Sequence, residues 1–455
     1  MEDNNTEVDL SLKNEEFYRR YGREKTVGMY TLGCKVNQYE TEAMMELFQQ
    51  RGYKIVDYNN RADIYLINTC SVTSRSDAKA RSLIRKAVRE NSGAVIAVVG
   101  CYTQTEPEEV RALPGVDIVA GTGERKRIVD LVEHYLKSGE RIVSVNDIQK
   151  NREFENLSVH KNRNRTRACL KIEDGCNLYC TYCIVPYARG PVRSRPYDEI
   201  LGEAKELADA GFRELVITGI HVSSYGRDLD NVGLVDVLKG INEIDGIDRI
   251  RLSSLEPRLL TVDVIKEMAS LSKLCRFFHI SLQSGCDATL KRMHRRYTPD
   301  EYREIVDNLR KYIHDVGIAT DVMVGFPGET DAEFKESYEF VREMNFSHVH
   351  VFSYSPRRGT KAYEYTDQND NKIKDKRNKA MRELAARMKK DFNRRFIGQE
   401  MDVLFENNKG DDLYEGLTDN YIRVLTKGNE SIRNAILSVK LKELKEIGRA
   451  SCRER

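Results

Sequence analysis

The chain has 455 residues, of which 40% are hydrophobic and 32% are charged, and its formal net charge is only +2. This length suggests about three domains, and the hydrophobic content is sufficient to build a core for each of them. No run of residues approaches the ~20 apolar positions that a membrane-spanning helix requires. Residues 1–13 are acidic and polar, without the apolar stretch of a secretory signal. We therefore expect a soluble, cytoplasmic protein without membrane partners.

The small net charge conceals two basic stretches. Residues 161–195 contain two acids and eight basic residues, namely Lys161, Arg163, Arg165, Arg167, Lys171, Arg189, Arg193 and Arg195. Residues 372–395 contain eleven lysines and arginines against three acids. The solvated face of a helix is an equally good interpretation of this second stretch. The first stretch surrounds a cysteine-rich loop, which makes a polyanionic substrate more credible there.

After a polar N-terminal extension (residues 1–24), residues 25–143 alternate apolar runs with amphipathic segments. Strands are predicted at 27–32, 64–68 and 94–99, and helices at 39–50 and 77–90, which is the βαβ pattern of an open parallel sheet. Cys34, Cys70 and Cys101 each follow one of these strands. Parallel strands direct their carboxyl ends to one edge, so the three cysteines could converge there. A buried structural role is the alternative for each cysteine alone, but their shared position favours a metal site.

Residues 144–164 are polar and without a clear period, as in a linker, and a second domain is predicted over residues 165–396. Its predicted strands are 167–172, 214–218, 249–253, 277–282, 319–324 and 348–352. Helical segments alternate with them at 197–210, 262–270, 299–315 and 331–344. Six βα units are too few for a closed eight-stranded barrel, so we predict an open, partial (βα)6 barrel with active groups at the strand carboxyl ends.

The loop after the first barrel strand carries Cys176, Cys180 and Cys183 in a C-x3-C-x2-C spacing. Three thiolates on one short loop can each bind one iron of a cubane cluster, which leaves the fourth iron open to a ligand that is not protein. A structural zinc site is the alternative, and zinc would require a fourth ligand. Disulfides are disfavoured because the ten cysteines cluster in motifs instead of forming the framework of a secreted protein.

A basic helix is predicted over residues 374–396, and the pattern then changes to short strands separated by polar turns. Within residues 397–447, strand-like runs occur at 401–405, 412–416, 421–425 and 435–440. This pattern is typical of a small antiparallel barrel of the kind that binds nucleic acid. Residues 448–455 are typical of neither strand nor helix, so we expect a non-native remnant there and exclude Cys452 from the chemistry. The predicted fold class is α/β, with an open parallel sheet, a partial barrel and a small antiparallel barrel in that order.

These motifs carry a resemblance that covers nearly the whole chain. The runs at residues 31–41 (TLGCKVNQYET), 68–73 (NTCSVT) and 99–104 (VGCYTQ) resemble the three cysteine motifs of the radical S-adenosylmethionine methylthiotransferase family. The cysteine triad, with Pro186 and Arg189-Gly190 after it, resembles the radical signature of that family. The last domain is similar to the TRAM domain, an RNA-binding barrel. The sequences of residues 33–38 and 219–226 resemble the subgroup that modifies threonylcarbamoyladenosine in tRNA more than they resemble the other subgroups of the family.

The resemblance implies two [4Fe-4S] clusters and S-adenosylmethionine as cofactors. The cluster that reductively cleaves S-adenosylmethionine would be bound by Cys176, Cys180 and Cys183. The auxiliary cluster, whose open iron can hold a sulfur species, would be bound by Cys34, Cys70 and Cys101. Reductive cleavage of S-adenosylmethionine at the first of these clusters would yield a 5′-deoxyadenosyl radical. This radical can abstract hydrogen from a C–H bond that no side-chain base can attack, so the cofactor must carry this chemistry.

The implied reaction adds a methylthio group to C2 of N6-threonylcarbamoyladenosine at position 37 of tRNA. The implied partners are that tRNA, an electron donor such as flavodoxin or ferredoxin, and a sulfur source. Two alternatives remain open. One is a methylthiotransferase of the same family that acts on isopentenyladenosine-37 of tRNA or on an aspartate of a ribosomal protein. The other, of a different class, is a non-catalytic RNA-binding protein in which both cysteine sets hold structural zinc.

Strand ends of the barrel domain supply the candidate S-adenosylmethionine-binding residues, which are Thr218, Gly219, Ser253, Glu256, Gln283 and Gly325. A role in a turn or at the barrel rim is the alternative for these strand-end residues. The candidate RNA-binding residues are Arg163, Arg165, Arg167, Arg193 and Arg195, and the basic run 291–296 is a further candidate. Their phosphate contacts predict strongly salt-dependent affinity. We interpret His221 as a local hydrogen-bonding residue, Tyr421 as a core residue, and Cys169, Cys275 and Cys286 as core or rim cysteines.

Overall fold

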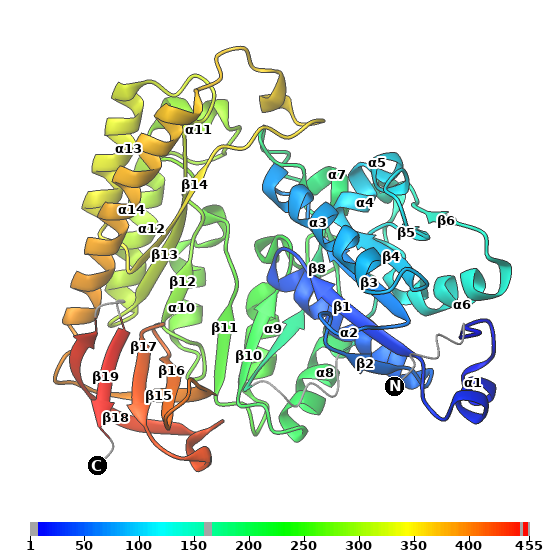
Figure 1. Cartoon of the computed structure of the whole chain (residues 1–455). Coiled ribbons are helices and arrows are strands. Elements are labelled where there is room, and N and C mark those ends of the chain that lie inside the picture. Colours follow the sequence, from blue (N-terminus) through cyan, green and yellow to red (C-terminus); the bar gives the residue numbers. More distant parts are fainter. Residues whose placement is uncertain (1–7, 159–165, 446–448, 454–455) are drawn as a thin grey trace. The chain divides into compact units, whose positions relative to one another are not determined.

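The computed structural model describes residues 8–158, 166–445 and 449–453, and the chain divides into two compact units (Figure 1). Within the described residues, unit 1 comprises residues 8–158 together with Asp174–Leu178 and Cys183–Arg193. Unit 2 comprises residues 166–173, Tyr179–Tyr182 and the described residues from 194 onward. None of the helices in these ranges combines the length and the apolar character needed to cross a membrane.

Unit 1 is built on a six-stranded parallel sheet with the order β2-β1-β3-β4-β5-β6. Its strands are β1 (Thr26–Thr31), β2 (Lys54–Val56), β3 (Ile64–Thr69), β4 (Val95–Gly100), β5 (Ile118–Ala120) and β6 (Ile142–Ser144). β3 and β4 are buried at every position, as expected of continuous apolar strands inside a parallel sheet. The predicted open parallel sheet is confirmed, and its three predicted strands correspond to β1, β3 and β4.

Helices cover both faces of this sheet (Figure 1). α2 (Lys35–Gln50) and α6 (Ile128–Ser138) share one core with alternate strand residues. α3 (Ser74–Glu90), α4 (Cys101–Thr105) and α5 (Pro107–Arg111) pack on the opposite face. α3 begins before the predicted residue 77 because the Thr73 hydroxyl accepts a hydrogen bond from the Ser76 amide and caps the helix. The shorter elements of the unit are α1 (Asn14–Tyr21), η1 (Arg125–Arg127), η2 (Ile148–Lys150) and α7 (Val185–Arg189).

Unit 2 contains six parallel strands in two sheets, ordered β11-β10-β7 and β12-β13-β14. These strands are β7 (Arg167–Lys171), β10 (Glu214–Thr218), β11 (Arg249–Leu252), β12 (Phe277–His279), β13 (Gly317–Val324) and β14 (His348–Ser353). Parallel bridges pair Ile250 with Leu274 and Leu255 with Ile280, which connects the two sheets into one open arc. The predicted partial (βα)6 barrel is therefore confirmed.

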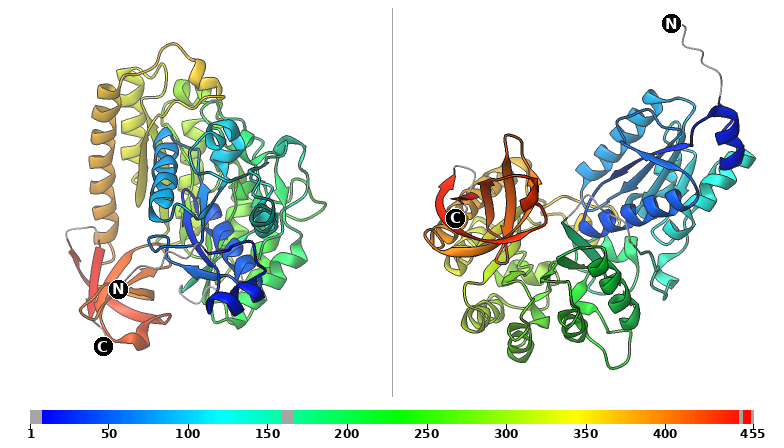
Figure 2. Two further views of the ribbon diagram at one scale, coloured as in Figure 1. Left: turned by 45° about the vertical axis from the view of Figure 1, so that its right-hand side comes forward. Right: turned by 90° about the horizontal axis from the view of Figure 1, so that it is seen from below.

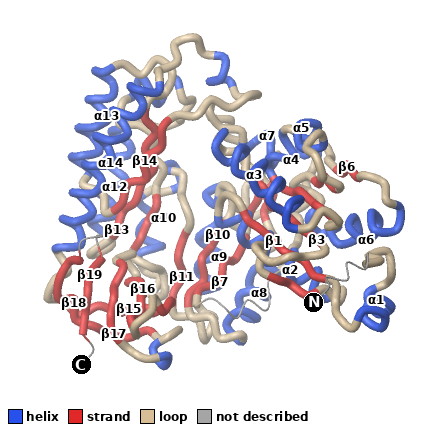
Figure 3. The backbone as a smooth tube through the Cα atoms, in the orientation of Figure 1, coloured by secondary structure: helices blue, strands red, loops and turns tan. Residues whose placement is uncertain are grey.

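Helices alternate with these strands along the chain and lie outside the arc (Figure 3). They are α8 (Tyr197–Asp209), α9 (Leu234–Asn242), α10 (Val262–Ala269), α11 (Asp287–Arg292), α12 (Pro299–Tyr312) and α13 (Asp331–Met344). One continuous apolar core joins them to the strands. The remaining short elements are β8 (Glu173–Asp174), β9 (Arg193–Ser194), η3 (Val222–Ser224), η4 (Pro257–Leu259) and η5 (Lys361–Glu364), and β8 pairs with β9.

The long helix α14 (Asn371–Arg394) leads into a closed five-stranded barrel at the C-terminal side of unit 2 (Figure 2). Its elements are β15 (Glu400–Asn408), β16 (Leu413–Thr418), β17 (Arg423–Lys427), η6 (Glu430–Ile432), β18 (Ile436–Lys445) and β19 (Arg449–Arg453). The expectation that residues 449–453 form neither strand nor helix is wrong. β19 pairs with both β17 and β18 and closes the barrel, so it satisfies edges that would otherwise stay open.

Within unit 2, the small barrel is fixed to the amino-terminal ends of the partial-barrel strands. Arg249 donates to the Leu417 carbonyl at 2.9 Å, and Arg276 forms an ion pair with Asp419 at 2.6 Å. Tyr421 stacks on Phe277 with ring centroids 4.3 Å apart. Tyr421 is half-buried and joins the two barrels, so it lies at their junction and not in the core of either one.

Candidate functional site

Cys34, Cys70 and Cys101 follow the carboxyl ends of three neighbouring parallel strands, β1, β3 and β4. Gly33 has a positive φ of 106°, and a Cβ atom at this position would lie 2.7 Å from Cys70 Cβ. A larger residue would clash there, so glycine permits the close approach of the Cys34 and Cys70 segments. The sheet thus brings the predicted auxiliary ligands to one edge of unit 1.

Asn37 holds two of these strand ends together. Its amide nitrogen donates to the Leu32 carbonyl at 2.7 Å and to the Thr69 carbonyl at 2.9 Å. These carbonyls belong to the segments directly before Cys34 and Cys70, so one side chain satisfies backbone groups from both. Asn37 lies in the first turn of α2, and sequence reasoning did not single it out as a functional residue.

Burial dominates the electrostatics of the Cys70 thiol. Burial and the neighbouring Cys101 raise the pKa of Cys70 to about 12. An uncomplexed Cys70 is therefore protonated at neutral pH, and a metal would have to displace that proton in order to bind a thiolate. Among the described residues, no group of three or more His, Cys, Asp or Glu side chains is already arranged around a common metal position. The donor chemistry and the shared strand edge suit an iron–sulfur cluster, and the ligand set stays a prediction.

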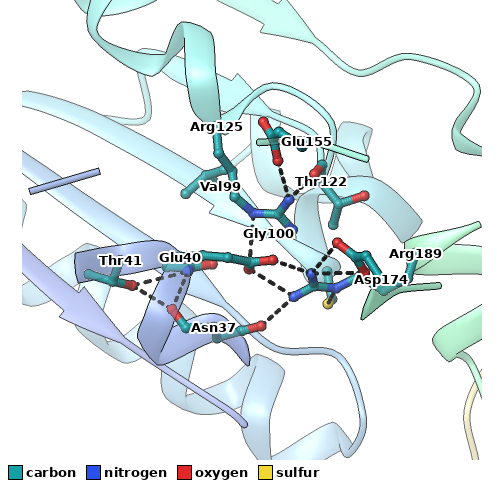
Figure 4. A network of polar contacts seen from close by, with 12 residues as sticks. Asn37, Glu40, Thr41, Val99, Gly100, Thr122, Arg125, Glu155, Asp174 and Arg189 are labelled. Carbon is teal, nitrogen blue, oxygen red and sulfur yellow. Dashed lines mark hydrogen bonds and ion pairs between the residues drawn. The ribbon is translucent and has the colours of Figure 1, made fainter. Parts of the chain in front are cut away.

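A buried network of charged groups surrounds Arg189 in unit 1 (Figure 4). Arg189, the last residue of α7, donates from Nε to Cys101 Sγ at 3.3 Å. Its two terminal nitrogens contact both carboxylate oxygens of Glu40, and Nη2 also donates to Asn37 Oδ1 at 2.5 Å. Asp174 lies 3.3 Å from Arg189 Nη1. The Arg189, Glu40 and Asp174 side chains are almost completely buried, so these contacts occur without competing solvent.

The loop of the cysteine triad runs from unit 1 through Tyr179–Tyr182 of unit 2 and back to unit 1. Gly175, directly before Cys176, has φ 89°, and a Cβ atom here would lie 1.9 Å from the Pro191 carbonyl oxygen. The Cys176 amide donates to the Gly190 carbonyl at 3.0 Å. These contacts hold the start of the loop against its end, and only glycine fits at position 175.

The unit 2 part of this loop contacts Arg295. Arg295 Nη1 lies 3.3 Å from Cys180 Sγ, and its Nε donates to the Tyr297 hydroxyl at 3.1 Å. The Arg295 side chain is only 6% exposed, and Arg292 in the same basic run is paired with Glu333 at 2.8 Å. Arg295 and Arg292 are therefore engaged inside the fold, although residues 291–296 were a candidate phosphate-binding run.

The candidate S-adenosylmethionine-binding residues all lie at the carboxyl edge of the partial barrel. Thr218 ends β10 and Gly219 follows it, Ser253 follows β11 with Glu256 close behind, Gln283 lies beyond β12, and Gly325 follows β13. Two of these residues already make hydrogen bonds within the protein. The Glu256 carboxylate accepts a hydrogen bond from the Arg258 amide, and the Gly325 amide donates to the Glu329 carboxylate. The structure brings the six residues to one edge and leaves their ligand contacts as predictions.

Two polar atoms at this edge of unit 2 are buried and make no hydrogen bond within the described part of the chain. They are Ser253 Oγ and His221 Nε2. Burial, with Arg227 and Arg295, lowers the pKa of His221 to about 4, so this imidazole is neutral at pH 7. Glu173 accepts a hydrogen bond from the His221 amide at 2.6 Å, and a Cβ atom at Gly219 would lie 2.7 Å from Glu173 Oε2. Sequence reasoning missed Glu173, although its place two residues after the end of β7 was a usable signal.

The candidate RNA-binding arginines have internal partners where the structure describes them. Arg167 forms an ion pair with Glu406 at 2.5 Å, and Arg195 forms a buried ion pair with Glu203. Arg193 donates to the Arg189 and Pro191 carbonyls at 2.9 and 2.8 Å. These contacts favour structural roles for Arg193 and Arg195. The other two candidates, Arg163 and Arg165, lie outside the described residues.

The remaining cysteines agree with their interpretation. Cys275 and Cys286 are buried and Cys169 is half-buried, as expected for core or rim positions. His221 also agrees in part, since Ser224 Oγ contacts its Nδ1.

Comparisons with known proteins cover the same regions. Residues 170–341 match the radical SAM superfamily, and residues 26–121 match an uncharacterized protein family, UPF0004. A threonylcarbamoyladenosine tRNA methylthiotransferase of Bacillus subtilis is 41% identical over 421 residues, which cover 91% of this chain and 93% of that protein. A tRNA-2-methylthio-N(6)-dimethylallyladenosine synthase of Finegoldia magna is 32% identical over 450 residues and is covered to 97%, as is this chain.

Among solved structures, a radical S-adenosylmethionine methyltransferase of Kitasatospora setae, with cobalamin and a [4Fe-4S] cluster bound, has a TM-score of 0.56. The match covers 75% of this chain and 77% of that one at 14% identity. At this level of identity the likeness shows a shared fold.

Proposed function

Because the chain belongs to the radical S-adenosylmethionine methylthiotransferase family of tRNA-modifying enzymes, we propose that it adds a methylthio group to C2 of N6-threonylcarbamoyladenosine at position 37 of tRNA. The observation that carries this substrate is the 41% identity to a threonylcarbamoyladenosine tRNA methylthiotransferase over 91% of the chain. The dimethylallyladenosine enzyme of Finegoldia magna reaches 32% over a similar span.

The auxiliary [4Fe-4S] cluster would be held by Cys34, Cys70 and Cys101. Their position after three adjacent strands supports this assignment, as does Gly33, which permits the approach of the first two segments. Three ligands leave one iron open, which suits a sulfur species as the group to be transferred. The sulfur source itself would be a separate partner.

The second [4Fe-4S] cluster would be held by Cys176, Cys180 and Cys183. When bound, this cluster and S-adenosylmethionine supply the radical chemistry, with electrons from a donor such as flavodoxin or ferredoxin. Gly175 and the Cys176 amide hold the start of the triad loop against its end, and Arg295 donates to the Cys180 sulfur. Hydrogen bonds of this kind to a ligand sulfur favour the more electron-rich state of a cluster.

S-adenosylmethionine would bind at the carboxyl edge of the partial barrel, in contact with Thr218, Gly219, Ser253, Glu256, Gln283 and Gly325. The buried Ser253 Oγ and His221 Nε2 support this placement, because neither has a hydrogen-bond partner within the described residues. A buried polar atom without a partner is unfavourable, and a polar ligand would supply the missing contact. A neutral His221 can accept or donate this hydrogen bond through Nε2.

The tRNA would contact a groove of unit 2 between β14 and α14. The groove has a volume of about 430 Å³, and Arg382 and Lys389 of α14 line it opposite His350 and Phe352 of β14. Phe352 is 49% exposed, which is unusual for a phenylalanine and leaves its ring open to stacking. Cations that track phosphates beside an exposed aromatic ring are typical of single-stranded nucleic-acid sites. Arg163, Arg165 and Arg167 remain additional candidates.

Mass spectrometry of tRNA nucleosides tests the substrate. A strain that lacks this protein should lose methylthio-threonylcarbamoyladenosine and accumulate its unmodified precursor. Persistence of that nucleoside would contradict the proposal. Loss of the methylthio-dimethylallyladenosine nucleoside in its place would indicate the other tRNA substrate, and unchanged tRNA would favour the ribosomal protein.

Anaerobic reconstitution tests the cofactors. We expect about eight irons per chain and negligible zinc, because two cubane clusters contain four irons each. A colourless protein that binds zinc and does not cleave S-adenosylmethionine would instead support the non-catalytic zinc alternative.

A further inference from the structure

Arg189 reaches from the radical motif of the sequence to the auxiliary site. It lies six residues after Cys183 in the chain, yet its Nε donates to Cys101 Sγ at 3.3 Å. Asp174, two residues before Cys176, lies 3.3 Å from the same guanidinium. All of these contacts fall inside unit 1, which contains both the loop base and Cys101.

The guanidinium uses its donors in two directions. Nη1 and Nη2 form a fork-like pair with Glu40, and Nη2 also contacts Asn37 Oδ1. This arrangement orients the plane of the group, because a bidentate carboxylate pair fixes both position and rotation. Nε is then left on the side that faces the Cys101 sulfur.

The surrounding ion pairs balance without the sulfur. Glu40 is shared with Arg125, whose Nε lies 3.0 Å from Glu40 Oε2 and whose Nη1 lies 2.8 Å from Glu155. Asp174 also faces Arg193 at 3.8 Å. Within the described part of the chain, these ion pairs join three guanidiniums to three carboxylates, namely Arg125, Arg189 and Arg193 to Glu40, Glu155 and Asp174. A hydrogen bond to Cys101 is additional to this balance, and it is strongest when the sulfur carries negative charge.

We propose that Arg189 is a positioning residue that sets the reduction potential of the auxiliary cluster through its hydrogen bond to Cys101. This inference rests on the proposed function, because it requires a cluster on Cys34, Cys70 and Cys101. Donors to a ligand sulfur stabilise the reduced, more electron-rich cluster and so raise its potential. The same residue holds Asp174, so the auxiliary site and the base of the triad loop share one buried anchor.

A redox titration of the auxiliary cluster tests the proposal. The full chain with all three triad cysteines changed to alanine would be reconstituted anaerobically, so that only the auxiliary cluster is observed by electron paramagnetic resonance. Arg189→Met should retain about four irons and show a more negative midpoint potential. Arg189→Lys keeps the positive charge but lacks the planar guanidinium and its Nε–H donor. Its midpoint potential should lie between those of Arg189→Met and the parent protein. Arg189→Lys also replaces Arg189→Met in the comparison if that variant does not fold.

Arg125→Met is the matched control. Arg125 is equally buried and shares Glu40, but its contacts within the network are to oxygen atoms. It should therefore leave the midpoint potential unchanged. An unshifted potential in the Arg189 variants, or an equal shift in Arg125→Met, would overturn the role of Arg189. If the protein with all three triad cysteines changed to alanine, and with Arg189 intact, binds no iron, then no auxiliary cluster forms. That result would reject both the proposed auxiliary cluster and this inference.

Discussion

Arg251 offers a stability test that does not depend on any cofactor. It lies in β11 with a fully buried guanidinium whose Nε is 2.6 Å from Glu214 Oε1 in β10. Its Nη1 also donates to the Asp419 carbonyl at 3.0 Å, and its Nη2 to the Thr418 carbonyl at 3.2 Å. One side chain thus joins two strands of the partial barrel to the small barrel of unit 2. Arg251→Met removes the charge while preserving most of the volume.

The expected loss of unfolding free energy is about 3 kcal/mol, at the lower end of the range for breaking a buried ion pair. Glu214 becomes a buried carboxylate without its main partner, which is the dominant penalty. Arg167 at 3.8 Å and Arg249 at 4.0 Å still face Glu214, and they limit the loss. The two carbonyls that lose a donor add to it.

The pH dependence has a defined sign. Burial alone would raise the pKa of Glu214, but Arg251 and the neighbouring arginines hold that pKa below its ordinary value of 4.5. The contribution of the ion pair is therefore fully present above pH 4.5 and is lost as the pH falls through the lower, folded-state pKa. The difference in stability between the parent protein and Arg251→Met should accordingly narrow in acid.

Urea unfolding of the metal-free chain, followed by circular dichroism, measures the effect. Arg213→Met is the control, because Arg213 forms a 2.5 Å pair with Asp248 that is partly exposed to solvent, and its loss should change stability by less than about 1 kcal/mol. The double variant Arg251→Met/Glu214→Leu should recover part of the lost stability, since it removes the buried carboxylate left without its main partner, while Arg249 loses a carboxylate neighbour. Equal losses in Arg251→Met and Arg213→Met, or no recovery in the double variant, would refute the reasoning.

Three further predictions concern the clusters and the RNA. Cys180→Ala should abolish formation of 5′-deoxyadenosine, whereas Cys70→Ala should retain some S-adenosylmethionine cleavage and lose methylthiolation; identical cleavage in both variants would contradict separate clusters. Gly175→Ala should fold yet lose about four of the irons, because its Cβ would strike the Pro191 carbonyl, and a full iron content would contradict this. Arg382→Glu should weaken tRNA binding and flatten its salt dependence, while Lys390→Glu, exposed on the same helix but outside the groove lining, should bind more nearly as the parent does.

The fold was largely accessible from the sequence because its signals are local. Continuous apolar runs followed by amphipathic segments specify buried parallel strands, and the cysteines after them acquire a common position from topology alone. β19 could not be predicted in this way. Its place depends on closing the barrel between its chain neighbour β18 and the earlier strand β17, and the local pattern of residues 449–453 does not reveal the pairing with β17.

The basic stretch around the triad shows why a count of charged residues could not predict which arginines are free to bind RNA. A run of arginines looks the same in sequence whether its side chains face solvent or buried carboxylates. Arg195 is paired with Glu203, and Arg189 with Glu40, a residue 149 positions away. Local composition therefore predicts the presence of positive charge but not the direction in which it points.

The network also provides a physical reason for the residues that follow Cys34. Gly33 allows the Cys70 segment to approach, Asn37 satisfies the strand-end carbonyls, and Glu40 orients Arg189. Asn37 and Glu40 lie three and six residues after Cys34, on the first turns of α2, so one helix start supports both the cysteine segment and the arginine beside Cys101. The motif around Cys34 thus does more than supply a ligand, because it determines where Arg189 places its hydrogen bond.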